Sequence, residues 1–79
     1  MKSELPALPT IPLGRYRHYK SAEMVYDVIG VARHSETLEP MVVYRALYGE
    51  GALWARPYEM FVGTVMVEGK LTPRFVKIG

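Results

Sequence analysis

Arginine and aromatic side chains alternate along short strand-like runs, and they are the residues best suited to chemistry. Arg15, Arg17 and Tyr19 would share one face of a strand, since successive side chains point to opposite sides. Guanidinium groups bind phosphate or carboxylate, and aromatic rings stack on planar groups in small β domains that bind single-stranded nucleic acid. The alternative is a solvent-exposed edge strand whose charges prevent edge-to-edge pairing.

A second candidate surface lies near the only tryptophan. Trp54 and Arg56 alternate onto one face, and we expect Arg45 of the neighbouring run to reach them. An aromatic ring flanked by guanidinium groups is a suitable platform for a ligand. The alternative is core or half-buried packing of Trp54, because a small barrel needs large side chains to fill its interior.

The loop at residues 34–39 offers the only cluster that resembles a catalytic site. In an enzyme, His34 would act as a base assisted by Ser35 or Glu36. However, adjacent loop residues rarely converge into a base, a nucleophile and an orienting group. We therefore favour a turn in which Ser35 and Thr37 bond the local backbone. We expect no catalytic residue, and retain His34 only as a candidate ligand-binding residue.

The composition excludes several kinds of chemistry. The chain has no cysteine and two histidines, so thiolate chemistry is absent and no zinc-binding spacing occurs. Its glycines fall singly at turns, which is unlike a phosphate-binding loop that opens a helix. We expect neither a metal nor a cofactor.

Length and charge predict one small domain. The 79 residues leave no room for a second core, and 49% of them are apolar, as in ordinary globular chains. A formal charge of +2 is too small to indicate nucleic acid or a membrane by itself. Because no apolar run approaches the ~20 residues that span a bilayer, we expect a cytoplasmic protein with no membrane contact.

Turn signals divide the chain into five predicted strands. We place them at residues 15–19, 25–33, 41–48, 53–56 and 74–78, with a 3₁₀ turn at residues 58–61 before the last strand. The pattern predicts an all-β fold, a small five-stranded open SH3-like barrel. Gly30 indicates a bulge or bend in the second strand. The expected inward residues are Tyr26, Val28 and Ala32 in the second strand and Val42, Tyr44 and Ala46 in the third.

An extended tail at residues 1–13 precedes the domain at residues 14–79. Pro6, Pro9 and Pro12 are three apart, which is the repeat of a polyproline II helix. The tail either lies loosely or packs its leucines on its own barrel. The alternative is that a neighbouring copy of the domain captures it.

Several ordered motifs together resemble a known family. The chain is similar to the small bacterial domain-of-unknown-function family 1653 from Gly14 to Ile78. This resemblance implies the extent of the domain but no activity and no site residue. The motifs are residues 16–20 (YRHYK), 32–39 (ARHSETLE), 42–45 (VVYR), Trp54, 56–57 (RP), 60–61 (MF) and 73–75 (PRF).

Three functions remain open from the sequence. The leading hypothesis is a non-catalytic binding module for an anionic or planar ligand, such as nucleic acid or a nucleotide. The alternative is a protein interaction or self-assembly module that uses the proline tail or an open strand edge. An enzyme that uses His34 is third. The candidate ligand-binding residues are Arg15, Arg17, Tyr19, His34, Arg45, Trp54 and Arg56.

Overall fold

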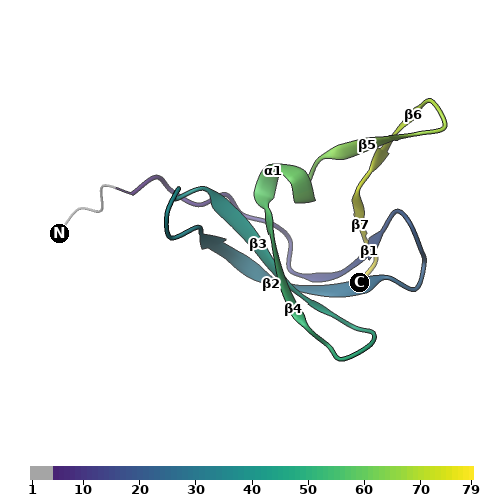
Figure 1. The fold of residues 1–79 in the computed structure, drawn as a ribbon, viewed down its shortest axis with the longest axis horizontal. Coiled ribbons are helices and arrows are strands. Elements are labelled where there is room, and N and C mark those ends of the chain that lie inside the picture. Colours follow the sequence, from purple (N-terminus) through teal and green to yellow (C-terminus); the bar gives the residue numbers. More distant parts are fainter. Residues whose placement is uncertain (1–4) are drawn as a thin grey trace.

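The computed structural model describes residues 5–79, so the first four residues of the predicted tail lie outside the described residues. The described part contains seven strands and one helical turn (Figure 1). In chain order these are β1 (Gly14–His18), β2 (Val25–Arg33), β3 (Pro40–Ala46), β4 (Leu53–Pro57), α1 (Tyr58–Phe61), β5 (Thr64–Val67), β6 (Lys70–Pro73) and β7 (Phe75–Lys77). No helix in this part is long and apolar enough to cross a membrane.

The strands form two antiparallel sheets. The larger has the order β4-β3-β2-β1-β7, and β5 pairs only with β6. Figure 1 shows this β5–β6 hairpin projecting away from the larger sheet, beyond α1. The all-β prediction is confirmed, but the backbone does not close into a barrel, because β4 and β7 stand at opposite ends of the strand order.

All five predicted strands are present, and the β5–β6 hairpin is the element that the sequence analysis missed. Glu68 and Gly69, which connect its two strands, both have positive φ. The flanking strands are only four residues each, and Pro73 ends the second of them. Such short strands give little alternation for sequence analysis to detect.

The register of the larger sheet defines an inner face. Tyr16 pairs with Tyr26, Tyr26 with Ala46, and Val28 with Tyr44, so these side chains point to the same side. All five are buried, which confirms the inward sets of the third strand and of the first half of the second strand.

Ala32 is the exception, because it is exposed rather than buried. The pairing of β2 with β3 shifts between Val28 and Gly30, which makes Ile29 an extra residue. This is the bulge that Gly30 predicted, and it reverses the alternation for the rest of the strand. Ala32 therefore faces away from the core.

Aromatic rings form most of the core. Phe61 stacks on Phe75 with ring centroids 4.0 Å apart and an interplanar angle of 9°. Tyr16 and Tyr44 contact Phe61 at 5.5 and 5.2 Å. Large rings supply the apolar area that a domain of this size cannot obtain from many aliphatic residues.

The helical turn α1 brings Phe61 into this core. It lies where a 3₁₀ turn was predicted, but the Val62 N–H donates to the Tyr58 carbonyl, so its bond is of the α type. It also precedes the hairpin rather than the last strand. Gly63 follows the turn at a position that favours glycine, since a Cβ there would lie 2.7 Å from the Glu59 carbonyl oxygen.

Truncating Phe61 tests the role of this core. Phe61 is 1% exposed, so Phe61→Ala should lower the free energy of unfolding by about 3–5 kcal/mol in urea denaturation. Met60→Ala is the matched control, because its side chain is 52% exposed in the same turn, and it should cost only about 0.5 kcal/mol. Equal losses in the two variants would contradict this account of the core.

Candidate functional site

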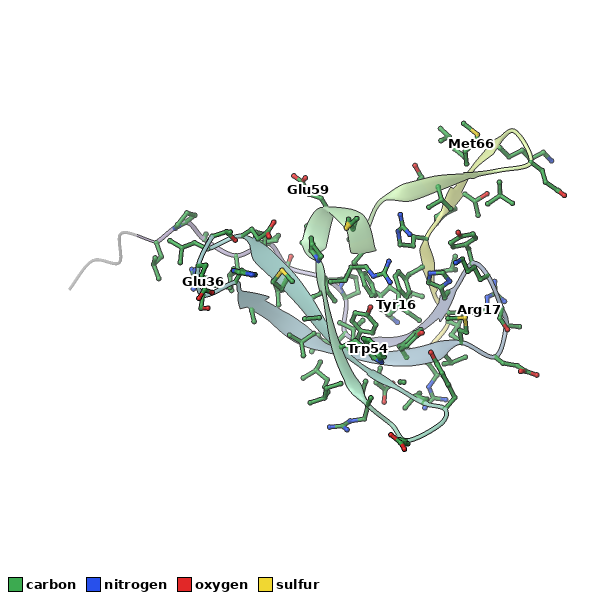
Figure 2. The ribbon with its side chains drawn as sticks, viewed as in Figure 1. Tyr16, Arg17, Glu36, Trp54, Glu59 and Met66 are labelled. Atoms are coloured by element: carbon green, nitrogen blue, oxygen red, sulfur yellow. The ribbon has the colours of Figure 1, made fainter. Side chains whose placement is uncertain are left out.

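The inner face of β4 carries the most accessible aromatic group of the larger sheet. Trp54 pairs with the buried Tyr44 and Arg56 with the buried Val42, so both project from the inner face at the sheet edge. Trp54 is 54% exposed, so it is not a core residue, and about half of its surface remains accessible. Figure 2 shows Trp54 near the middle of the molecule.

Arg56 is held in place without being neutralised. Its Nε donates to the Tyr44 hydroxyl at 3.2 Å, and its guanidinium carbon lies 5.5 Å from the centroid of the Phe75 ring. No carboxylate of residues 5–79 lies within ion-pair distance of it. The terminal nitrogens of this positioned cation are therefore available to an anion.

His18 lies buried beside Arg56 and is kept neutral. Its ring meets Phe75 edge-on at 4.9 Å, and its Nδ1 accepts the Lys20 N–H at 3.2 Å. Burial lowers the pKa of His18, and the nearby charges of Arg56, Lys20 and Arg74 lower it further. Because Nδ1 accepts a hydrogen bond, we assign the proton of the neutral ring to Nε2. The neutral His18 ring, with its N–H donor, thus lies near the cations Arg56, Lys20 and Arg74.

A pair of tyrosines borders this region. The hydroxyls of Tyr26 and Tyr48 are 2.6 Å apart, and Tyr48 is 42% exposed. Burial raises the pKa of Tyr26, and the hydrogen bond with Tyr48 raises it further, so the Tyr26 hydroxyl stays protonated. We call Trp54, Arg56, His18, Tyr44 and Tyr48 the inner-face site.

The outer face takes the other predicted arginines. Arg15 pairs with Asp27 and Asp27 with Arg45, so these three residues share the face opposite to the core residues. Arg15 forms an ion pair with Asp27 at 3.8 Å, and Arg45 donates to the Gly51 carbonyl at 3.0 Å. Arg17, two residues after Arg15 in β1, lies on the same face.

The expectation that Arg45 flanks Trp54 is therefore wrong. Arg45 pairs with Leu53, whereas Trp54 pairs with Tyr44. The alternation within each run was predicted correctly, but the alignment between the two runs is one residue away from the one that would bring Arg45 to Trp54. The predicted residues thus divide between two faces instead of forming one surface.

Tyr19 and His34 occupy separate places. The Tyr19 ring lies 4.7 Å from the His18 ring, which puts it next to the inner-face site. His34 lies at the other end of the sheet, where its Nδ1 accepts the N–H groups of Glu36 and Thr37. The Ser35 hydroxyl donates to the Glu36 carboxylate rather than to His34, so this loop has the geometry of a turn.

The inner-face site also contains residues that the sequence analysis did not select. His18, Tyr44 and Tyr48 were treated as parts of strands or of the core. Alternation did place Tyr16 and His18 together, opposite Arg15 and Arg17. The signal that was overlooked is a histidine on the core side of a strand, where burial alone disfavours its charged form.

Comparisons with known proteins extend this description. Residues 14–77 match the model of a protein family described as "Protein of unknown function (DUF1653)". The chain belongs to this family. The crystal structure of a DUF1653 protein from Bordetella bronchiseptica is similar to this domain, with 35% identity, a TM-score of 0.76, and coverage of 87% of this chain and 88% of that chain. A search of curated proteins gave no match.

The DUF1653 match covers the whole inner-face site and leaves out the tail. Its range begins at Gly14, the first residue of β1, and ends at Lys77, the last residue of β7. The family resemblance seen in the sequence is thereby confirmed. Since the family description gives no activity, the site must be interpreted from its own geometry.

The buried His18 predicts how the stability of this DUF1653 domain depends on pH. Its pKa is lowered from the ordinary value of 6.5 in the folded state, so the unfolded chain binds the proton first as the pH falls. The free energy of unfolding should therefore decrease below about pH 6.5. Denaturant unfolding at pH 5, 6 and 8 measures this decrease.

Two asparagine variants isolate the contribution of His18. His18→Asn keeps an acceptor for the Lys20 N–H but does not titrate, so its stability should change less between pH 8 and pH 5 than that of the wild type. His34→Asn changes the histidine at the other end of the sheet and should retain the wild-type decrease. An equal decrease in wild type and His18→Asn would rule out His18 as the source.

Proposed function

We propose that this domain is a non-catalytic binding module whose inner-face site holds a planar, anionic ligand, either a nucleotide or single-stranded nucleic acid. The observation that carries the proposal is the pairing of an exposed Trp54 with an unneutralised Arg56 on the same face of an edge strand. The ring would stack on a base, and the guanidinium would bind a phosphate.

The spacing of these two groups supports a ligand with both features. Trp54 and Arg56 are two residues apart on one strand, so their Cα atoms are about 6.6 Å apart and their side chains project from the same face. The hydrogen bond from Arg56 to Tyr44 fixes the guanidinium before the ligand arrives. A positioned side chain loses less conformational entropy on binding than a free one.

His18 supports the anionic half of the proposal. Its pKa is lowered by burial and by the charges of Arg56, Lys20 and Arg74, so positive charge gathers around this part of the inner face. A negative ligand would relieve the repulsion among Arg56, Lys20 and Arg74. The same relief would make it easier for His18 to accept a proton, and binding should strengthen toward lower pH while the domain stays folded.

The non-catalytic part of the proposal has separate support. His34 uses its Nδ1 to hold a turn, and the neighbouring Ser35 hydroxyl is directed to Glu36. We also include in this proposal an open SH3-like arrangement of the five-stranded sheet and its helical turn. Because one fold hosts many unrelated functions, the binding role rests on the site and not on the fold.

Nucleotides and short oligonucleotides should bind at low salt and quench the fluorescence of Trp54, which is the only tryptophan. Trp54→Ala should weaken binding by about 1–3 kcal/mol, measured by chemical-shift titration because this variant lacks the fluorophore. Added salt should also weaken binding, because phosphate contacts release counterions.

The two faces of β3 and β4 provide matched controls. Leu53→Ala removes a side chain of similar exposure from the opposite face of β4, and Arg45→Ala removes the same charge as Arg56→Ala from the outer face. Only Trp54→Ala and Arg56→Ala should weaken binding substantially. Chemical shifts that do not move at low salt, or equal effects of Leu53→Ala and Trp54→Ala, would overturn the proposal.

A further inference from the structure

The N-terminal tail is seated in a groove on its own domain. Residues 5–13 form neither a helix nor a strand, yet three domain side chains donate hydrogen bonds to them. The Tyr16 hydroxyl bonds the Pro12 carbonyl at 2.7 Å, and the Tyr58 hydroxyl bonds the Thr10 carbonyl at 3.4 Å. Further along, the Arg33 guanidinium bonds the Pro6 carbonyl at 2.6 Å.

These contacts recognise an extended backbone rather than particular side chains. Every donor belongs to the domain, and every acceptor is a backbone carbonyl of the tail. Aromatic-lined grooves bind proline-containing segments in this way, because a polyproline II backbone leaves its carbonyls free. Burial and the neighbouring Tyr58 raise the pKa of Tyr16, so its hydroxyl remains a donor.

The tail fills its groove only in part. Ile11 packs against the core, but a cavity of 230 Å³ remains between the tail and the domain. Its domain side is formed by Tyr16, Tyr58, Phe61, Val62 and Phe75. A second, more open space of 360 Å³ separates residues 8–11 and Leu13 from Gly30 and Val31. The tail is thus held by a few hydrogen bonds and by Ile11 as an apolar anchor. A substitution in the tail can therefore weaken its binding without changing the groove.

We propose that this groove is a binding site for extended, proline-containing segments, and that its ligand in trans is the tail of a second copy of this chain. The occupant is chosen because residues 5–13 already fit the groove. Their three prolines restrict the backbone in advance, which lowers the entropy cost of binding. The inference is independent of the inner-face ligand.

Gly14, the first residue of β1, joins the tail to the domain. Gly14 has a φ of 133°, a conformation that L side chains rarely adopt, and a Cβ there would collide with the Gly79 carbonyl. A tail tethered so closely occupies its own groove at an effective concentration of about millimolar or higher. Exchange between copies should therefore be detectable only at comparable protein concentrations.

The first test measures binding of a labelled peptide with the sequence of residues 5–13. Its host is the full chain carrying Ile11→Asp, which weakens the attached tail and leaves the groove intact. The peptide should bind this host at least tenfold more tightly than it binds the wild type. Tyr58→Phe in the same host should weaken binding, and a peptide with its prolines replaced by glycine should bind poorly.

A second host guards against a folding defect in Ile11→Asp. The full chain with Pro6, Pro9 and Pro12 replaced by glycine loosens the tail without changing the groove, and should also bind the peptide more tightly than the wild type. If neither host binds the peptide while both unfold cooperatively, the groove is not a binding site and the proposal fails.

The second test identifies the occupant. The chain has no cysteine, so Ala7→Cys accepts a single spin label on the exposed part of the tail. Mixed at millimolar concentration with ¹⁵N-labelled wild type, the labelled chain should broaden the amide signals of Tyr58 and Phe61. Broadening elsewhere only, or none, would overturn exchange between copies. If an unrelated proline-containing peptide binds more tightly than the peptide of residues 5–13, the ligand in trans is another protein and not a second copy of this chain.

Discussion

The stack of Phe61 on Phe75 is the interaction on which the fold depends. Phe61 follows β4 through α1, and Phe75 belongs to β7, so the two rings come from the opposite ends of the sheet order. Their centroid separation of 4.0 Å brings these two ends together, and beside the rings the Arg74 N–H donates to the Gly63 carbonyl at 3.0 Å. In the part of the chain that the structure describes, β4 and β7 do not pair with each other, so aromatic packing closes the sheet beside this one bond.

The inner-face site follows from this closure. Arg56 extends from β4 over the ring of Phe75, and His18 meets the same ring from β1. The Phe75 ring thus contacts both the Arg56 guanidinium and the His18 imidazole at the edge of the core. Because aromatic groups cannot neutralise charge, Arg56 gives this part of the inner face a positive potential at the β4 edge of the sheet.

Sequence alone predicted much of this arrangement, because alternation depends on local backbone geometry. Tyr26, Val28 and Tyr44 were assigned inward correctly, and Gly30 marked the bulge. The position of Arg45 was not predicted, since it depends on how two strands align, and that alignment is set by pairings between distant residues. The exposure of Trp54 likewise depends on β4 being an edge strand, which no local pattern encodes.

The bulge in β2 has a consequence for the seating of the tail. Before Ile29 the strand supplies Tyr26 and Val28 to the aromatic core, and after it Gly30 and Val31 lie beneath the tail. In a regular strand, the even-numbered residues would face the same side along both halves. The extra residue shifts the second half by one position, so Val31 pairs with the buried Val42 and faces the inner side, where it lies beneath the tail. Without the bulge, this odd-numbered residue would face outward, as Asp27 does, and the tail would lose part of the surface on which it rests.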